Sequence, residues 1–381
     1  MVVAFSAFGS GVEGGGMNRR GMLTASAAVV ASALLGACGG GTTAADAAKP
    51  SEAAKKAFQI GWSIYAGWMP WPYAKQAGIV QKWADRYGIA IDLIQVNDYV
   101  ESINQYTAGK LDGVVSTTMD ALTIPAAGGK DTSVVIIGDY SNGNDGIVLK
   151  NAKAMADIKG RTVNLVELSV SQYLLARGLE QAGLKLTDVK TVNTSDADIV
   201  GAFASNDVTT AVTWNPQLSE LRKAPGATEV FSSARIPNEI LDVMNVSTAT
   251  LAANPALGKA LAGIWYEVMA IMARDDAAAV GARRAMAQLA GTTPESFDAQ
   301  LQTTFLYNTA QQALAYALSP DLIAVTDRVR QFSFSRGLFG PAARSVDAIG
   351  IAFPGKTLGD PANIKLRFDP TYMQLAAAAK L

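Results

Sequence analysis

The chain has 381 residues, which is too long for one compact core of ordinary size and predicts about two domains. Apolar residues make up 49% of the chain and charged residues 17%, which is typical of a globular protein and excludes a disordered one. The 32 basic side chains nearly cancel the 33 acidic ones, so no basic surplus points to a nucleic-acid partner.

Two residue types are scarce in a way that excludes whole classes of chemistry. The sequence contains no histidine, which excludes Ser-His-Asp and Cys-His catalysis and histidine metal sites. Cys38 is the single cysteine, so an intramolecular disulfide and a thiolate cluster are excluded as well. We therefore expect no metal site and no cofactor.

The first part of the chain has the layout of an export signal. A basic segment with Arg19 and Arg20 follows Met17, and the apolar run 25–35 leads into Gly36-Ala37-Cys38. That run is too short to span a bilayer comfortably. A cysteine at this place resembles a bacterial lipobox, which predicts that Cys38 is lipidated; an ordinary signal peptide containing Cys38 is the alternative. We predict an export signal over 1–37, with 1–16 as an extension before Met17.

The residues after Cys38 are small and polar and show no apolar period. They predict a flexible tether over 38–57, with the folded part beginning near Phe58. The expected location is therefore the periplasm or cell envelope, with the membrane contacted only through the lipid anchor.

From residue 58 onward, strand-like and helix-like runs alternate, which is typical of a parallel-rich sheet flanked by helices. The period of Tyr73, Val80, Ala84 and Tyr87 predicts one helix over 72–87, ended by Gly88. Further helices are predicted over 100–109 and 119–129. Strands are predicted over 58–64, 89–96, 111–117, 131–140 and 146–150.

The alternation is repeated in a second unit and then gives way to long helices. Within that unit we predict strands over 161–167, 189–194 and 209–214 and helices over 169–183 and 197–205. After it, a strand over 243–251 returns to the first unit. We therefore predict a first lobe over 58–148, a second lobe over 149–242, and a return with the C-terminal helices over 243–381. Two connections of this kind form a hinge, and a ligand binds between the lobes.

Several of these segments resemble a known family. The stretches Phe58-Gln-Ile-Gly-Trp, LDGVVSTTMDAL, ADIKGRTVNL, SQYLLARGLE and AFASNDVTTAVTWNPQLSE are similar to substrate-binding proteins of nitrate/sulfonate/taurine-type ABC transporters. The tail SVDAIGIAFPGKTLGDPANIKLRFDPTYM resembles the branch associated with urea carboxylase and guanidinium uptake. The resemblance implies a type II periplasmic-binding-protein fold in the α/β class, with two lobes joined by a two-strand hinge. It also implies a permease and an ATPase as partners.

The ligand class can be inferred from the ends of the predicted strands, where α/β proteins bind their ligands. These ends carry the following residues: Tyr65, Trp68, Asp98, Thr117, Thr118, Asp120, Asp139, Asn142, Asp145, Glu167, Asp196, Asp198, Trp214, Asn215 and Asp242. The set is aromatic and acidic and contains no lysine or arginine, which an anion site would require. Carboxylates and aromatic faces both attract cations.

From this set we select candidate ligand-binding residues, while some of its members have an alternative structural role. The candidates are Tyr65, Trp68, Asp120, Glu167, Trp214 and Asp242. Three further carboxylates are weaker candidates: Asp98, Asp145 and Asp198. Asp120 could instead cap its helix, Asp198 could do the same, and Asp145 could organise the turn before it.

The function predicted from these residues is a monomeric transport receptor, not an enzyme, that binds a small planar cation with guanidinium favoured. Within the same fold, receptors for urea or another small amide, or for taurine, sulfonate or nitrate, are alternatives. An exported carboxylate-dependent enzyme is the alternative from another class. A pyrimidine-precursor synthase of the thiamine pathway shares the fold but relies on histidine.

Overall fold

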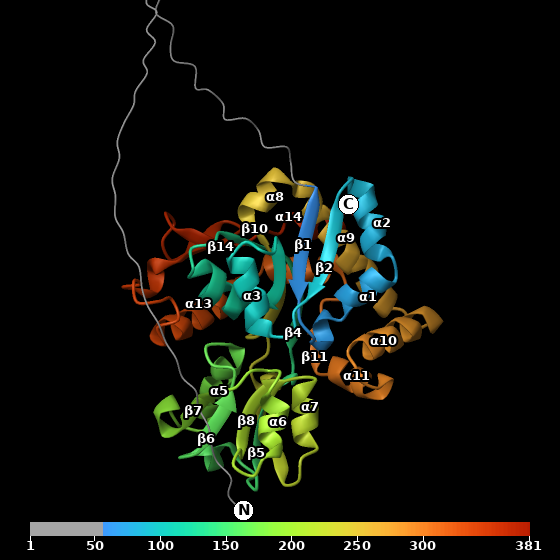
Figure 1. Cartoon of the computed structure of the whole chain (residues 1–381). Coiled ribbons are helices and arrows are strands. Elements are labelled where there is room, and N and C mark those ends of the chain that lie inside the picture. The colour runs from blue at the N-terminus through green and yellow to red at the C-terminus, as the bar shows by residue number, and fades with distance from the viewer. Residues whose placement is uncertain (1–55) are drawn as a thin grey trace, which may run out of the picture. The chain divides into compact units, whose positions relative to one another are not determined.

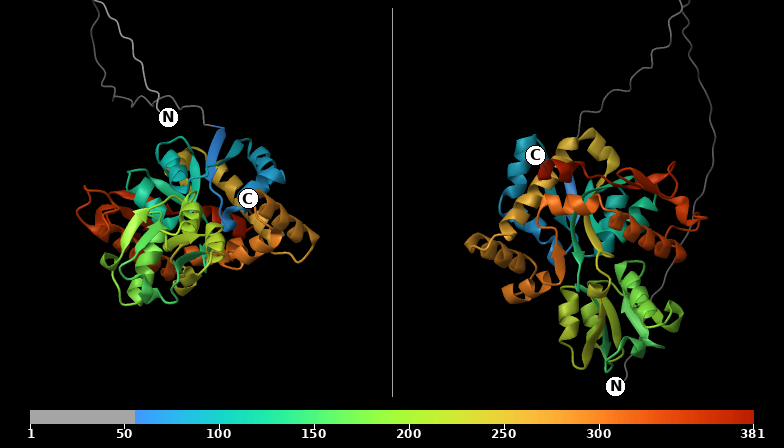
Figure 2. Two further views of the ribbon diagram at one scale, coloured as in Figure 1. Left: turned by 60° about the horizontal axis from the view of Figure 1, so that its bottom comes forward. Right: turned by 180° about the vertical axis from the view of Figure 1, so that it is seen from behind.

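Two β-sheets form the framework of the described part of the chain, residues 56–381 of this computed structural model. The predicted export signal, Cys38 and nearly all of the predicted tether lie outside the described residues. The two sheets occupy different halves of the view in Figure 1, and the reverse view in Figure 2 shows the same division.

The first sheet has nine strands among the described residues, in the order β13-β12-β14-β4-β10-β3-β1-β2 with β11 paired to β4. Its strand pairs are mixed: β1 runs parallel to β2 and β3, and β14 runs parallel to β4 and β12, whereas β10 runs antiparallel to both β3 and β4. The strand bounds are β1 Ala57–Trp62, β2 Ala90–Gln95, β3 Gly113–Thr117, β4 Thr132–Ser141, β10 Leu241–Ser247, β11 Thr304–Leu306, β12 Gly350–Phe353, β13 Lys356–Leu358 and β14 Ile364–Phe368.

The second sheet has five strands within the described range, in the order β7-β6-β8-β5-β9. Its bounds are β5 Asp145–Lys150, β6 Thr162–Leu165, β7 Lys190–Asn193, β8 Thr210–Trp214 and β9 Ala227–Ser232. The central strand β8 is buried along its whole length, which fits its apolar sequence TAVTW.

Helices lie on both faces of the first sheet, with α1, α2 and α9 on one side and α3 on the other (Figure 1). The α-helices are α1 Pro70–Gln76, α2 Ile79–Tyr87, α3 Tyr99–Thr107, α4 Thr118–Ala121, α5 Val170–Gln181, α6 Ile199–Ala204, α7 Gln217–Arg222, α8 Thr248–Ala253, α9 Pro255–Met272, α10 Ala277–Leu289, α11 Pro294–Leu301, α12 Ala310–Ala317, α13 Pro320–Ser335 and α14 Thr371–Ala377. Short 3₁₀ turns lie at Ala66–Trp68, Met155–Ile158, Leu186–Asp188, Ser233–Arg235 and Val346–Ala348, and a π-helical turn at Leu122–Ala126.

The chain passes between the sheets twice. It leaves the first sheet at the end of β4 and enters the second at Asp145, and it returns from β9 to β10. The predicted lobe boundary between residues 148 and 149 falls inside β5, and the predicted boundary between residues 242 and 243 falls inside β10. The strand predicted over 146–150 therefore pairs in the second sheet, with β8 and β9.

Three local predictions differ from the structure for identifiable reasons. The helix predicted over 72–87 is two helices, because Gly78 adopts a left-handed φ of 73° between α1 and α2. The strand predicted over 243–251 ends at Ser247, after which α8 begins. The part predicted as C-terminal helices within 243–381 also contains three strands, β12 to β14. They extend the first sheet beyond β4.

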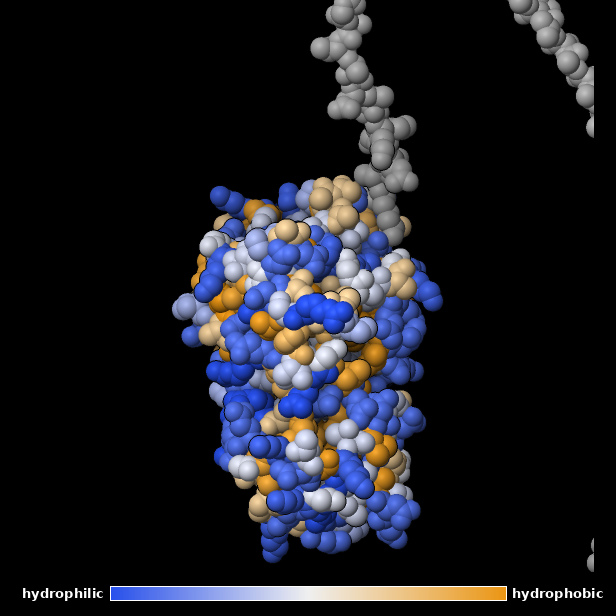
Figure 3. Space-filling view, turned by 90° about the vertical axis from the view of Figure 1, so that its left-hand side faces the viewer, coloured by the Kyte–Doolittle hydropathy of each residue, from blue (hydrophilic) through white to orange (hydrophobic). Residues whose placement is uncertain are grey.

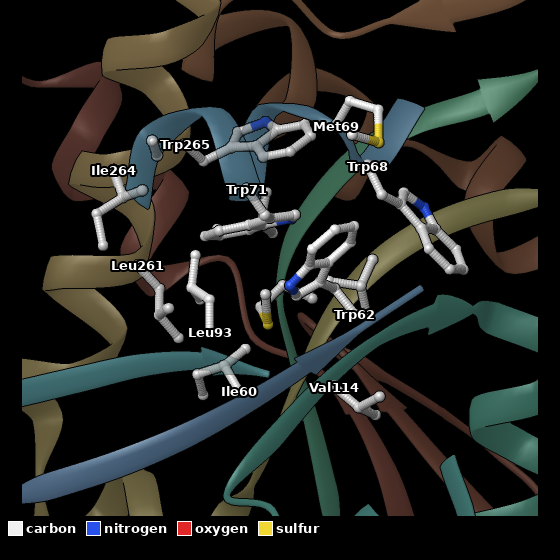
Figure 4. Close-up of a cluster of buried hydrophobic side chains, with 14 of the residues drawn as sticks. Ile60, Trp62, Trp68, Met69, Trp71, Leu93, Val114, Leu261, Ile264 and Trp265 are labelled. Atoms are coloured by element: carbon white, nitrogen blue, oxygen red, sulfur yellow. The ribbon is translucent and has the colours of Figure 1, made fainter. Parts of the chain in front are cut away.

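The aromatic residues near β1 divide between the core and its edge. Trp71 is buried against Trp265 of α9, with ring centroids 5.2 Å apart. In the close-up of this cluster, Trp62 also lies among the aliphatic side chains, whereas Trp68 is set apart at its border (Figure 4). Most rings of the stretch 61–78 thus stabilise the core, and Trp68 is placed where the first sheet faces the second.

The surface on the side shown in Figure 3 is largely hydrophilic, with smaller apolar areas between the charged residues. No single helix in residues 56–381 is long and apolar enough to cross a membrane; α9 and α10 meet these criteria only as a pair bent by 115°.

The packing of α2 on α9 gives a test of the core. A Cβ atom at Gly263 of α9 would lie 2.4 to 2.6 Å from ring atoms of Trp83. We expect Gly263→Ala to lower the free energy of unfolding by about 1–3 kcal/mol through overpacking. Gly281→Ala on the exposed side of α10 meets no atom within 4 Å and is the matched control. It should raise stability by up to about 1 kcal/mol. Urea unfolding of both variants checks this, and equal effects would contradict the tight contact.

Candidate functional site

A small cavity lies where the ends of strands from both sheets approach each other, and we call it the inner cavity. It leaves about 20 Å³ open to the centre of a water molecule, whereas one water needs about 10–15 Å³. Only a very small ligand fits this arrangement. The inner cavity is lined by Tyr65, Trp68, Tyr99, Thr117, Asp145, Val170, Trp214, Ile240 and Asp242.

Four aromatic rings form a continuous wall around the inner cavity. Tyr65 and Trp68 follow β1, with ring centroids 5.1 Å apart. Tyr99, the first residue of α3, lies 5.5 Å from Trp68 and 5.7 Å from Trp214 at the end of β8. Because Trp214 belongs to the second sheet, the wall is complete only when the two halves of the molecule are together. The indole N–H of Trp68 is buried and finds no acceptor among the described residues.

Two buried carboxyl groups face the inner cavity. Asp242 is the second residue of β10 and Asp145 is the first residue of β5, so both lie at the strand ends that face the cavity. Each is only 3% exposed. Burial raises the pKa of Asp145 to about 7. Burial and the negative charge of Asp139 hold the pKa of Asp242 well above its usual range. None of the described lysine or arginine side chains lines this cavity, so a cation entering it would supply the missing positive charge.

Asp120 lies one step away from the inner cavity and positions one of its rings. Its Oδ2 accepts hydrogen bonds from the Tyr99 hydroxyl at 2.6 Å and from Thr117 Oγ1 at 2.9 Å. The backbone N–H of Asp120 donates to Thr117 Oγ1, which caps α4. Burial raises the pKa of Asp120 to about 6. The residue predicted as a ligand contact therefore fixes the orientation of Tyr99, and the predicted capping role belongs to Thr117.

A second, wider hollow adjoins Asp120, and we call it the outer groove. Its volume is about 610 Å³, and its acidic lining residues are Asp98, Glu101, Asp120, Glu167 and Asp196, with Arg336 opposite. Glu167 is placed here and not in the inner cavity, and its Oε1 accepts a hydrogen bond from Thr191 at 2.5 Å. Asp98 caps α3 by accepting from the Glu101 N–H at 2.8 Å. Asp198 lines neither hollow and accepts from the Ser195 hydroxyl at 2.7 Å.

Two contacts connect the halves of the molecule on either side of these hollows. Asp196, which precedes α6, accepts a hydrogen bond from the backbone N–H of Tyr99. Glu239, in the segment that returns to β10, is 5% exposed and accepts from Tyr173 at 2.5 Å, Arg177 at 2.8 Å and Arg328 at 2.6 Å. Tyr173 and Arg177 lie on α5 beside the second sheet, whereas Arg328 lies on α13, which packs against α4.

The structure thus brings together five of the nine acidic and aromatic candidates: Tyr65, Trp68, Asp145, Trp214 and Asp242. Three lining residues, Tyr99, Val170 and Ile240, had no place among the strand-end residues, because Tyr99 and Val170 begin helices and Ile240 directly precedes β10. The position of Tyr99 directly after the strand-end residue Asp98 is the signal that could have pointed to it. Asp139 lies within β4, near its end, and it lines a void behind Asp242 rather than the inner cavity.

The raised pKa of Asp145 predicts a pH-dependent effect of removing it. The folded protein holds this proton more tightly than the unfolded chain, whose Asp pKa is about 3.9, so the burial cost is absent below about pH 4 and grows up to about pH 7. Asp145→Asn should therefore gain stability relative to the parent between pH 5 and pH 8, by on the order of a few kcal/mol. Urea unfolding at both pH values measures this. The exposed Asp207→Asn should show no such change with pH, and an equal effect of Asp145→Asn at both values would rule out the protonated state.

The sequence of this chain is similar to those of several known proteins. A putative binding protein of Brucella abortus (strain 2308) is 28% identical over 152 residues, which cover 39% of this chain and 46% of that protein. The chain therefore matches less than half of the length of that relative. A putative aliphatic sulfonates-binding protein of Escherichia coli (strain K12) is 33% identical over 103 residues, or 27% of this chain and 30% of that protein.

Solved structures show the same fold. The alkanesulfonate-binding protein SsuA from Xanthomonas axonopodis pv. citri, bound to MOPS, is similar with a TM-score of 0.63 at 18% identity, covering 76% of this chain and 96% of that chain. The predicted periplasmic-binding-protein fold is confirmed by this likeness. Residues 81–275, just over half of the 381, match the model of the family described as NMT1/THI5 like, and the chain belongs to that family.

Proposed function

We propose that the protein is the extracytoplasmic substrate-binding component of an ABC importer and that it binds a small planar organic cation, with guanidinium favoured. The observation that carries the ligand class is the inner cavity, where four aromatic rings surround the buried carboxyl groups of Asp145 and Asp242. The relatives support the transport role by being named binding proteins, and the fold places the cavity between the two halves of the chain.

Charge distinguishes this cavity from a site for a sulfonate or a nitrate. An anion needs arginine, lysine or a set of backbone N–H groups around it. The inner cavity offers carboxyl groups and ring faces instead, and each ring face attracts a cation by about 0.5–2 kcal/mol. The sulfonate preference in the name of the Escherichia coli relative is therefore not carried over to this chain.

Shape and hydrogen bonding favour a guanidinium among cations. It is flat, so it can stack against Trp68 or Trp214, and its N–H groups can donate in its plane to Asp145 and Asp242. Urea has the same shape but no charge, so it would leave these buried carboxylates uncompensated if they were ionised. The small volume of the inner cavity excludes ligands with large substituents in this conformation.

A ligand panel tests the proposal directly. Calorimetry with guanidinium, methylguanidine, urea, taurine and nitrate should give the strongest binding for guanidinium and none for the two anions. Nuclear magnetic resonance of the incubated ligand should show no conversion, as expected for a receptor. Binding of taurine or nitrate without guanidinium would refute the cation assignment, and turnover would favour the carboxylate-dependent enzyme.

Trp214, the aromatic residue that the second sheet contributes to the inner cavity, gives a sharper test of the site. Trp214→Leu keeps an apolar side chain but removes the aromatic face, so guanidinium should bind roughly 2- to 30-fold more weakly. Trp214→Phe keeps a ring and should lose much less. Calorimetry of both variants measures this. Equal losses in the two variants would show that Trp214 contributes packing and no cation–π attraction.

Uptake by living cells tests the importer role. Cells lacking the protein should lose guanidinium uptake at low external concentration, and the parent sequence should restore it. Trp214→Leu should restore it less well than Trp214→Phe. Normal uptake in its absence would contradict the assignment as the binding component.

A further inference from the structure

A pair of buried acids lies at the edge of the inner cavity. Asp139 of β4 and Asp242 of β10 are directly opposite each other in the antiparallel ladder, which brings their Cβ atoms to about 4.5–5.5 Å. Their side chains are 0% and 3% exposed. Asp242 lines the inner cavity, and Asp139 lies one layer deeper, in a smaller void beside Trp68, Trp71 and Trp265.

The surroundings of this pair contain acids and no base. Both carboxyl oxygens of Asp139 and Oδ2 of Asp242 are buried without a hydrogen-bond donor among the described residues. The titratable groups that act on the pair are Tyr65 after β1, Asp145 on β5 and Tyr307 after β11, and Asp120 acts on Asp145 in turn. No described lysine or arginine lines the inner cavity or the void behind it, and the chain has no histidine, so among these groups a proton is the positive charge that the protein itself can place on the pair.

Two ionised carboxylates facing each other away from water are strongly disfavoured. A carboxyl O–H between them removes one charge and also supplies the donor that the buried oxygens lack. Burial accordingly raises the pKa of Asp139 to about 7, and burial together with the charge of Asp139 holds the pKa of Asp242 well above its usual range. The ligand-free protein therefore holds a proton on this pair near neutral pH.

The loop that carries Trp68 closes over the pair. A Cβ atom at Gly67 would lie 2.7 and 2.9 Å from the two carboxyl oxygens of Asp139. The backbone of the loop thus covers Asp139 and keeps water away from it, and only Asp242 can meet a ligand. Asp139 acts through Asp242 and is a positioning residue in this sense.

We propose that the Asp139–Asp242 pair sets the charge specificity of the inner cavity by exchanging its proton for the ligand cation. This inference rests on the proposed function. When the cation enters, the carboxyl O–H bond breaks, the electron pair stays on the carboxylate, and the proton passes to the solvent. The ligand then donates N–H hydrogen bonds to the freed oxygen. The net charge of the site is unchanged by the exchange.

The proton exchange should make the protein discriminate between the guanidinium cation and urea, which has the same shape but no charge. A cation competes with the proton, so guanidinium should bind more tightly as the pH rises from about 5 to 7, by up to about tenfold per pH unit for one proton released. Urea cannot replace the proton, and its affinity should not rise over this range. The preference for guanidinium over urea is thus greatest at the upper end of the range.

Calorimetry can measure how many protons are released when guanidinium binds. Guanidinium binding at pH 7 is measured in two buffers with different ionisation enthalpies, and the difference in heat should correspond to about one proton released. In Asp139→Asn the amide N–H can donate to Asp242, which then ionises in the free protein. This variant should bind guanidinium with little proton release and a flatter pH dependence. The exposed Asp207→Asn should match the parent in both respects.

A ligand-free measurement tests the same pair independently. The infrared carbonyl band of protonated carboxylic acids should be present in the parent at pH 7, be weaker in Asp139→Asn, and lose intensity in the parent when guanidinium is added, while the contribution of other protonated acids such as Asp145 remains. Guanidinium binding without proton release or loss of band intensity overturns the exchange and leaves the proposed function standing. If guanidinium does not bind, both fall, and the band then shows only whether the ligand-free pair is protonated.

Discussion

The constraint on which this cavity depends is that a buried carboxylate needs a positive charge nearby. Asp139, Asp145 and Asp242 are all buried, the chain contains no histidine, and no lysine or arginine of residues 56–381 lines the inner cavity or the void behind it. The aromatic wall makes the constraint more severe, because it replaces water by ring faces. Protonation meets the requirement in the free protein, and a small cation meets it in the proposed complex. In this proposal, the absence of basic side chains around the cavity determines the ligand as much as the buried carboxyl groups do.

The sequence was informative where position along a strand determines the role of a residue. Tyr65, Trp68, Trp214 and Asp242 follow or adjoin strand ends, and the topology brings all four to one cavity. The sequence was less informative about which of the two hollows a strand-end residue faces. Glu167 and Asp242 both sit at strand ends, but Glu167 lies in the outer groove and accepts a hydrogen bond from Thr191, whereas Asp242 lines the inner cavity.

The fold class followed from alternating strand-like and helix-like runs, whereas several boundaries did not. A left-handed glycine such as Gly78 divides a helix without disturbing its apolar period, so the period alone joined α1 to α2. The C-terminal strands are short and partly exposed, and they join the first sheet only through β14, whose partner β4 is more than 200 positions away in the sequence. Tyr99 could not be placed in the wall because its neighbours Trp68 and Trp214 come from distant segments.

Contacts between the two halves connect the cavity to the rest of the molecule. Asp196 bonds to the first residue of α3, and that residue, Tyr99, is also a wall of the cavity. Glu239 draws together α5 and α13 through Arg177 and Arg328. Moving the halves apart therefore breaks the aromatic wall and these polar contacts at the same time.

The missing side chain at Gly67 has a consequence for how this site can vary among related proteins. Any larger residue there would occupy the space of the Asp139 carboxyl group, so the two positions cannot change independently. A relative that carries a bulkier residue in place of Gly67 must either replace Asp139, which alters the charge behind the cavity, or shift the loop. Under the proposed cation assignment, the pair Gly67 and Asp139 is a marker by which proteins of this family could be sorted according to the charge behind the cavity.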